Sequence, residues 1–515
     1  MFDKHRKRRV IYNDDADQQY DSYKSHYKYD KHNYKYDILD EQDFIDSRTS
    51  PTFNTQVDTY VWCLGNGADP PWGLSYPSRG FRPLPFLQNN QRATDIIIEA
   101  CHQQGMEVWG SLRMNDIHDS FMANSLEESC EPIKAEHPEW LIEPLESRHL
   151  SNEITERYLW TALNFALPEV REYRLAYIEK TASEHNFDGF ELDFTRFIWN
   201  FPLGEGVKNA YLMTKLLRQT RRILDAIGEQ RGRKYTLVVH VMDSPQVSLD
   251  LGLDVDTWVT EGLVDVLVVG MGYTAYVVRL DEWQKLARSN NVQVYPSVNT
   301  NIFGTSWMEL LGRPVHHEAL RAASDYYWHK GANGLYVFNL FDQRDLRNAP
   351  FSQDYIYQPM SEIGDPATLV GKNKLYAIQP SSDRGFCHQG SEKAPLPIAL
   401  DQSEHLLPLE IGFDANSSQA KFTIRAWTTG GTKDDRVWFR LNNHLLETRC
   451  EGQWYEALVP HGVLRSGSNH LSIFCNRRGA GGRRLDPDHP EVYHGLSEDT
   501  SPIIVHRVFV PVSYT

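Results

Sequence analysis

Eight short runs of apolar and β-branched residues recur along the first 340 residues of this chain, and segments with helical periodicity separate most of them. Strands that alternate with helices pair in parallel, because each helix carries the chain back to the end where the previous strand began. Eight such units are typical of a closed (β/α)8 barrel rather than an open sheet. We therefore expect an α/β fold, a TIM barrel, with strands at residues 9–14, 59–64, 107–113, 189–194, 236–242, 264–270, 292–298 and 334–340.

Two connecting helices can be predicted in detail. Pro168 suits the first position of a helix that ends before the fourth strand, since proline has no N–H to leave unsatisfied there. Asp254 is a suitable N-cap for a helix before the sixth strand, and Gly262 a suitable residue to end it.

The pattern changes towards the C-terminus. Residues 361–376 are interpreted as the last barrel helix and its exit, and from residue 396 short alternating strands follow without helical periodicity. This predicts two domains: a barrel over residues 1–376 that carries the catalytic site, and an accessory antiparallel β-sandwich over residues 377–515. Sandwich strands are expected at 407–413, 420–428, 436–441, 454–459, 470–475 and 503–510, with Trp427, Trp438 and Trp454 in the core.

Charge and hydropathy argue against two classes of partner. Lys and Arg total 53 against 69 Asp and Glu, a formal net charge of −16, whereas proteins that bind nucleic acid or anionic membranes need a basic surface. No run approaches the about 20 apolar residues of a membrane span, and no apolar segment follows the basic N-terminus. We expect a cytoplasmic protein, although a removed signal would leave the same pattern, and the oligomeric state stays open.

The cysteines and glycines give no sign of a cofactor. The six cysteines are scattered without the spacing of metal ligands, which favours free thiols. Neither a Gly-x-Gly-x-x-Gly fingerprint nor a Walker phosphate loop is present. Asp116 and His118 alone supply too few ligands for a metal ion. We expect neither cofactor nor metal.

The fourth predicted strand carries an unusual polar face. Glu191 and Asp193 alternate with Phe190, Leu192 and Phe194, and Arg196 follows the strand. Parallel barrel strands are covered on both faces, so two carboxylates there are costly unless they serve a site. The C-terminal ends of barrel strands are where catalytic side chains lie.

Polar and aromatic residues also follow the other predicted strands. Together they would surround the mouth of the barrel and offer several carboxylates beside aromatic rings, which suits a carbohydrate site. The catalytic candidates are Asp193, Asp243 and Glu191, and the substrate-binding candidates are Arg196, Asp14, Asp15, Trp62, Arg113, Asn115, Asp116, His118, His240, Tyr273, Asn299 and Asn339.

Residues 188–197 resemble the strand-4 motif of the barrel proteins called family 10 glycosylhydrolase-like, in which Asp-Gly-hydrophobic-x-Leu-Asp-x-x-Arg recurs. Residues 252–265 and 337–339 also resemble that group. The resemblance covers most of the barrel and implies its fold and a hydrolase character, but no particular substrate. Family 18 chitinases fit less well, because their catalytic Glu stands where this chain has Thr195.

Two hypotheses for function follow. The first is a glycoside hydrolase that cleaves a poly- or oligosaccharide, with Asp193 as nucleophile or electrostatic partner and Asp243 as acid/base. Asp14, Asp15, Asp116 and Asp342 compete for the second role. Glu191 is either catalytic or an interior carboxylate satisfied by Arg113 or Arg196. The alternative is a non-catalytic carbohydrate-binding protein on a degenerate hydrolase barrel, which the lack of a Glu at an expected acid position favours.

Overall fold

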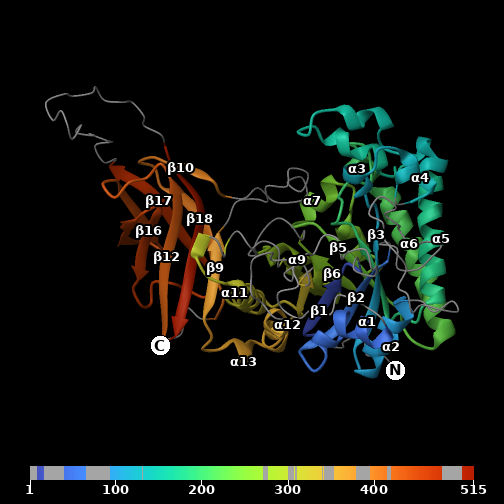
Figure 1. Ribbon diagram of the computed structural model, residues 1–515, viewed down its shortest axis with the longest axis horizontal. Helices are drawn as coiled ribbons and strands as arrows, with labels where there is room; N and C mark the ends of the chain where they lie inside the picture. The colour runs from blue at the N-terminus through green and yellow to red at the C-terminus, as the bar shows by residue number, and fades with distance from the viewer. Residues whose placement is uncertain are drawn as a thin grey trace. The chain divides into compact units, whose positions relative to one another are not determined.

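A computed structural model describes residues 8–16, 40–64, 93–129, 131–270, 277–299, 307, 310–338, 340, 353–378, 395–413, 419–477 and 502–514 (Figure 1). The chain forms two compact units. The first comprises Met1–Pro314, Gly331–Thr368 and Ser382–Glu392, and the second comprises Val315–Lys330, Leu369–Ser381 and Lys393–Thr515. No helix in these described ranges is long and apolar enough to cross a membrane.

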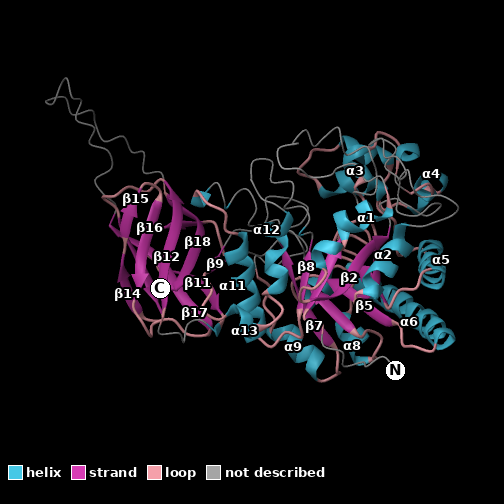
Figure 2. Cartoon of the chain, turned by 60° about the horizontal axis from the view of Figure 1, so that its bottom comes forward, coloured by secondary structure: helices cyan, strands magenta, loops and turns pink. Residues whose placement is uncertain are grey.

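The first unit contains a closed barrel of eight parallel strands in the order β1 to β8, as the sequence predicts. Figure 2 shows the strands surrounded by helices, which explains why their residues are buried on both faces. The strands are β1 (Val10–Asp14), β2 (Val57–Leu64), β3 (Glu107–Arg113), β4 (Gly189–Asp193), β5 (Thr236–Val241), β6 (Val266–Val269), β7 (Gln293–Asn299) and β8 (Leu335–Phe338).

Both helices predicted in detail are present. Pro168 begins α5 (Pro168–Glu184), and the Asp254 side chain caps α8 (Val255–Thr260) by accepting from the backbone N–H of Thr257 at 3.1 Å. The long α6 (Gly206–Arg231) packs beside α5 on the outside of the barrel (Figure 1). Further helices of this unit are α1 (Glu41–Arg48), α2 (Ala93–Gln103), α7 (Pro245–Asp250), α9 (Asp281–Arg288) and α12 (Gln353–Tyr357), with 3-10 turns η2 (Ser50–Thr52) and η9 (Gln358–Ser361). Helix α13 (Pro366–Leu369) lies where the two units divide.

The segment between β3 and α5 forms a small helical layer beyond the C-terminal end of β3. It contains α3 (Asp119–Met122), α4 (Ile133–Glu136) and the 3-10 turns η4 (Leu126–Glu128), η5 (Pro138–Trp140), η6 (Leu145–His149) and η7 (Thr155–Thr161). Buried ion pairs hold this layer in place. Lys134 Nζ donates to Asp119 at 2.9 Å, and Arg174 of α5 forms a bidentate pair with Glu131 at 2.5 and 2.9 Å. A segment without long helices thus gains a fixed conformation.

The second unit is an antiparallel β-sandwich. One sheet has the order β10-β18-β12-β16-β15 with β9 paired to β18, and the other has the order β11-β17-β13-β14. Burial alternates along β12 and β13, so every second side chain enters the core. The strands are β9 (Lys374–Ile378), β10 (Ile398–Leu400), β11 (His405–Ile411), β12 (Ala420–Thr429), β13 (Arg436–Leu441), β14 (His444–Glu447), β15 (Arg449–Glu451), β16 (Trp454–Val459), β17 (Gly467–Arg477) and β18 (Ile503–Tyr514).

Helix α11 (His316–His329), which follows β7 in sequence, belongs to this second unit. Asp325 accepts hydrogen bonds from Tyr376 Oη at 2.6 Å and from the backbone N–H of Phe413 at 2.8 Å, which joins α11 to β9 and to the end of β11. Ala322 of the same helix lies in the sandwich core.

Two sequence predictions for this region are wrong. Residues 361–376 do not form the last barrel helix and its exit, because they hold the short α13 and the beginning of β9, whose Tyr376 packs in the sandwich core. The predicted domain boundary at residue 376 falls inside that strand and stays a prediction. Trp427, Trp438 and Trp454 are half-buried and lie outside the core cluster, because Ala426, Phe439 and Tyr455 take the core-facing positions beside them.

Candidate active site

Strand register places two layers of polar side chains inside the barrel near its C-terminal end. Glu191 of β4 pairs with Ser111 of β3, and one pleat further on Asp193 lies between Arg113 of β3 and His240 of β5. Because strand residues alternate between faces, these positions share the interior face with Trp109 and Val238, which belong to the apolar barrel core below them.

Glu191 lies in the lower polar layer and is fully buried. Its Oε1 accepts hydrogen bonds from Ser111 Oγ at 2.6 Å and Tyr336 Oη at 3.0 Å. The prediction that Arg113 or Arg196 satisfies this carboxylate is wrong, because both arginines pair with Asp15 instead. Burial, and then the charge of Asp193, raise the pKa of Glu191 to about 8. Glu191 is therefore largely protonated at neutral pH.

Asp193 lies in the upper layer and is 6% exposed. Its Oδ1 accepts from the backbone N–H and the hydroxyl of Thr195, both at 2.8 Å, and from the backbone N–H of Arg196 at 3.3 Å. The turn that follows β4 thus holds one carboxylate oxygen in place.

His240 faces Asp193 across the upper layer. Its Nε2 lies 2.9 Å from the carbonyl oxygen of Gly270, which can only accept, so Nε2 carries the hydrogen. Burial lowers the pKa of His240, which favours the neutral ring with a lone pair on Nδ1. That Nδ1 is 3.9 Å from Asp193 Oδ1, which already accepts from Thr195 and Arg196. A hydroxyl group of a bound molecule could donate its hydrogen to His240 Nδ1, the acceptor that lacks a partner among the described residues.

Several interior polar atoms have no hydrogen-bond partner within the described part of the chain. They come from four different strands of the barrel, and all belong to residues that are buried. An interior that leaves such atoms unpaired suits a site that receives water or a polar ligand. The atoms are Asn13 Oδ1, Glu191 Oε2, His240 Nδ1 and Ser297 Oγ.

A network of arginines and carboxylates lies beside these layers. Arg113 pairs with Asp15 at 2.7 Å and with Asp116 at 3.0 Å, and Arg196 pairs with Asp15 at 3.1 Å. Burial opposes the ionisation of Asp15, but Arg113 and Arg196 outweigh it and hold its pKa below the usual value. Asp116 also accepts from His118 Nδ1 at 2.7 Å. For Asp116 too, His118 and Arg113 overcome burial and hold the pKa well below its usual range.

Three predicted substrate-binding residues have their polar atoms engaged in the fold. Asp14 accepts from Arg48 at 2.6 Å and from Tyr60 Oη at 2.5 Å. The indole of Trp62 is buried and donates to Thr94 at 3.0 Å. Asn115 bonds the backbone of Leu163 and Trp199, so it anchors the loops around the mouth. Substrate contact by these residues stays a prediction.

For four further predicted residues the structure gives less information about the side chain. Asp243 follows β5 and is buried, and its backbone oxygen accepts from Trp283 at 3.0 Å. Tyr273 and Asn339 lie outside the described residues, as does the competing Asp342. Asn299 ends β7, but its side chain is outside the described part of the structure.

Sequence reasoning did not identify Ser111 and Tyr336, the two partners of Glu191. Both lie on the interior face of their strands, since Trp109 and Phe338, two residues away, are interior core residues. The alternation along β3 was the available signal for Ser111. Tyr336 approaches Glu191 from the opposite side of the barrel, and no local pattern predicts that contact.

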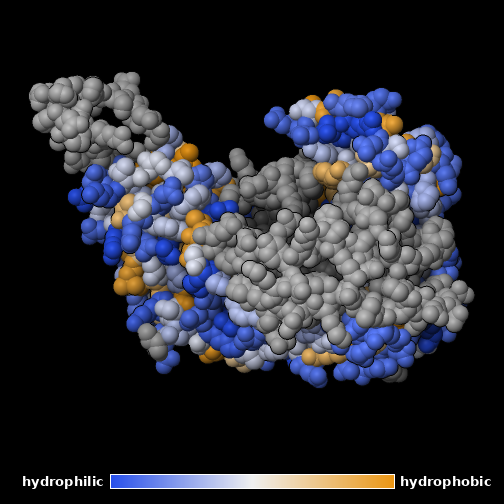
Figure 3. Space-filling model, in the orientation of Figure 1, coloured by the Kyte–Doolittle hydropathy of each residue, from blue (hydrophilic) through white to orange (hydrophobic). Residues whose placement is uncertain are grey.

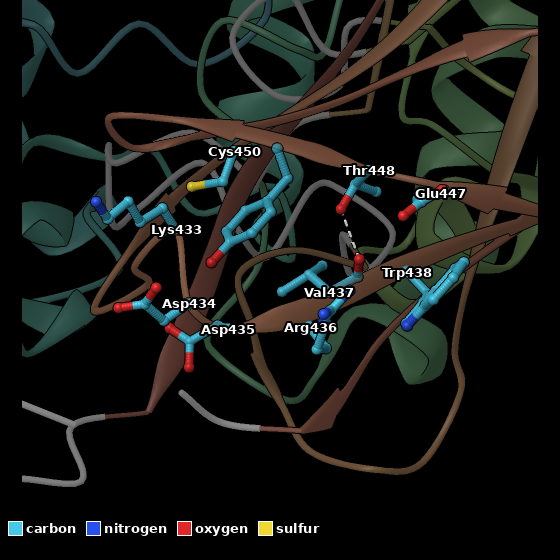
Figure 4. Close-up of a pocket in the computed structure, with 10 residues that line it drawn as sticks. Lys433, Asp434, Asp435, Arg436, Val437, Trp438, Glu447, Thr448 and Cys450 are labelled. Carbon is cyan, nitrogen blue, oxygen red and sulfur yellow. Dashed lines mark hydrogen bonds between the residues drawn. The ribbon is translucent and has the colours of Figure 1, made fainter. Parts of the chain in front are cut away.

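Two pockets lie away from the mouth. One, of about 200 Å³, is at the N-terminal end of the barrel, where Arg8 pairs with Glu107 and Lys234 pairs with Asp265. The other, of about 210 Å³, lies in the sandwich, and Figure 4 shows the hydrogen bond from Thr448 to the carbonyl of Val437 on its wall. No cluster of metal ligands is found among the described side chains.

No protein-family model matches this chain, and no curated protein matches it either. Solved structures with a similar fold include an α-amylase from Anoxybacillus, with 14% sequence identity, a TM-score of 0.42, and coverage of 93% of this chain and 100% of the other. An α-amylase from Geobacillus thermoleovorans complexed with acarbose has 12% identity and a TM-score of 0.39, and the match covers 91% of this chain and 99% of the other. A chitinase from Rhizomucor miehei has 13% identity and a TM-score of 0.33, and the match covers 60% of this chain and 93% of the other. At these values we draw nothing from them about the chemistry of this chain.

Proposed function

We propose that this protein is a glycoside hydrolase whose substrate binds at the C-terminal mouth of the barrel. The observation that carries the proposal is the pair on β4: Glu191, buried and largely protonated, lies one pleat below Asp193, whose Oδ1 is held by the Thr195 turn. A fixed carboxylate at the end of a barrel strand suits attack on an anomeric carbon or stabilisation of an oxocarbenium ion.

In this proposal Asp193 carries the negative charge and Asp243 is the acid/base. Glycoside cleavage needs a proton for the leaving oxygen, and we assign that role to Asp243, which follows the neighbouring strand β5. Glu191 acts from below: as a neutral acid it adds no second negative charge beside Asp193. The resemblance of residues 188–197 to the family 10 glycosylhydrolase-like motif supports a hydrolase character for the barrel.

The arginine and carboxylate network would contact the sugar. Arg113, Asp15, Arg196 and Asp116 provide charged donors and acceptors in a fixed arrangement, and the His118 ring lies beside them, which suits the several hydroxyl groups of a sugar ring. His240 Nδ1 adds an acceptor that a hydroxyl can reach from inside the barrel.

The test is a reducing-end assay over a panel of poly- and oligosaccharides, with the wild type, Asp193→Asn and Asp58→Asn. Asp58 is the matched control, because it pairs with Arg9 at the N-terminal end of the barrel. New reducing ends with the wild type and Asp58→Asn, but not with Asp193→Asn, support the proposal. No cleavage of any glycan by the wild type contradicts it.

One observation favours the alternative, a non-catalytic carbohydrate-binding protein. Asp14, Asp15 and Asp116 all have cationic or hydroxyl partners, so their carboxylates are committed to the fold. Isothermal titration with the same glycans distinguishes the two functions. Binding without new reducing ends favours the alternative.

A further inference from the structure

A row of aromatic rings runs outward from the arginine and carboxylate network. The His118 ring meets Phe197 edge-on at 4.7 Å between centroids, Phe197 lies 6.3 Å from Phe121, and Phe121 is stacked on Tyr158 at 4.9 Å with 26° between the planes. We refer to Phe197, Phe121 and Tyr158 as the aromatic row. Its rings come from the turn after β4, from α3 and from η7.

The outer part of the aromatic row is open to solvent. Phe121 is 45% exposed, whereas Phe197, next to His118, is buried. Exposing a phenylalanine is unfavourable, since burial of such a side chain is worth about 1.5–3 kcal/mol. Figure 3 shows hydrophobic atoms on the surface among the hydrophilic ones of the helical layer between β3 and α5. A ligand that covered the exposed ring would remove its apolar surface from water.

The aromatic row is continuous with the candidate active site. His118 contacts Phe197 with its ring and Asp116 with its Nδ1 at 2.7 Å, and Asp116 pairs with Arg113, the register neighbour of Asp193. Side-chain contacts therefore link Phe121 to the polar network beside Asp193. The row lies on the side of the mouth formed by the β3 and β4 loops.

The aromatic row is also fixed before any ligand binds. Tyr158 Oη donates to the backbone oxygen of Asn152 at 3.0 Å, and Asn115 fixes the chain at Leu163 and Trp199 on both flanks of the row. Lys134 donates to the backbone oxygen of Asp116 at 2.7 Å. Tyr158, held in this way, would lose less rotamer entropy when a ligand binds.

From these observations we propose that Phe121 and Tyr158 form a sugar-binding subsite for an uncharged stretch of an oligosaccharide whose neighbouring residue lies at Asp193. This inference rests on the proposed function. The C–H face of a pyranose ring is apolar and flat, so it can cover Phe121, while its hydroxyl groups remain available to solvent and to the network at His118 and Asp116. A small aromatic area beside polar groups suits a sugar better than a protein interface, which needs a larger patch.

The experiment measures kcat/KM against substrate length for Phe121→Ala and Tyr158→Ala, with Tyr211→Ala as the matched control. Tyr211 is 66% exposed on the outer helix α6 of the same unit. We expect kcat/KM to fall about tenfold for long oligosaccharides, to stay unchanged for the shortest cleaved substrate, and to recover in Phe121→Tyr. Thermal melting checks that each variant is folded.

The outcomes separate this inference from the proposed function. If the wild type cleaves oligosaccharides and Phe121→Ala is unaffected at every length, the subsite is wrong and the hydrolase proposal stands. An equal loss at every length also overturns the subsite. If the wild type binds without cleaving, the same variants are titrated with long and short oligosaccharides, and a loss of affinity confined to the long ones supports the subsite without the hydrolase.

Discussion

Glu191 and Asp193 occupy successive interior positions of β4, and the deeper of the two carries a pKa raised to about 8. Burial is the first cause and the negative charge of Asp193 is the second. Glu191 is therefore largely protonated at neutral pH and adds no second negative charge to the interior of the barrel.

Asp193→Asn should abolish turnover while the protein stays folded. Asparagine keeps the volume and the Oδ1 that accepts from Thr195, so the turn after β4 should survive. The negative charge is lost, and we expect the rate to fall by orders of magnitude while glycan affinity persists. The check is the reducing-end rate beside circular dichroism and titration. A folded variant that keeps more than about a tenth of the wild-type rate, less than about 1.4 kcal/mol of lost stabilisation, contradicts the assignment.

Glu191→Gln should stabilise the protein increasingly as the pH rises. An unfolded Glu titrates near about 4.3, and Glu191 titrates at about 8 when folded. Between these values the unfolded chain has released a proton that the folded protein retains, so wild-type stability falls as the pH rises. Glutamine has no proton to lose and still accepts from Ser111 and Tyr336. The variant should gain a few kcal/mol relative to the wild type between pH 5 and pH 9.

Urea unfolding of both proteins at each pH measures that difference. The slope with denaturant should agree between the two, so that a shift in the midpoint reports stability. A constant difference from pH 5 to pH 9 would show that Glu191 is ionised in the folded state at neutral pH.

The sequence predicted the barrel because its strands are covered by helices that follow in order along the chain. The predicted strand at residues 107–113 is β3 to the residue, and β4 is one residue shorter than expected. β9 was missed because its first residues were interpreted as the exit of a helix, and its partner β18 begins at Ile503, far along the chain. Local periodicity carries no information about such a pairing.

The candidate site could be predicted only at the level of strands. Register follows from the strand assignments, so Arg113, Asp193 and His240 were expected at one end of the barrel, and they lie side by side there. Contacts between side chains of different loops do not follow from the strand assignments. Asp15 and Arg196 come from different βα loops, and their contact depends on loop conformations that no periodic pattern encodes.

Asp15→Asn should destabilise the protein strongly. Asp15 is buried and pairs with Arg113 and Arg196, so asparagine would leave two guanidinium groups facing a neutral amide. Removing one partner from a buried ion pair costs about 3–5 kcal/mol. The pKa of Asp15 is lowered in the folded state, so its contribution is present at neutral pH and is lost as the pH falls through that lowered value.

Urea unfolding at pH 7 measures the stability lost in Asp15→Asn, with Asp58→Asn as the control. The Asp58 pair with Arg9 is part-exposed and is expected to contribute at most about 1 kcal/mol. Equal losses in the two variants would show that the pairs of Asp15 contribute no more than an exposed salt bridge. The difference in free energy of unfolding between the two variants should become smaller at acid pH.

A chain that ends at Tyr376 should lose stability, while its active site keeps its catalytic residues. Such a chain keeps every described residue of the candidate site, but it loses β18, the partner of β9, and uncovers Ala322 of α11. Asp325→Asn is the milder matched variant, since it weakens the contacts to Tyr376 and Phe413 in the full-length chain. We expect aggregation or a lowered melting temperature for the truncated chain and a smaller decrease for Asp325→Asn. A stable truncated chain that binds glycan normally and cannot cleave it would show that the sandwich supplies catalytic residues, because the barrel would then hold the binding site without the full chemistry.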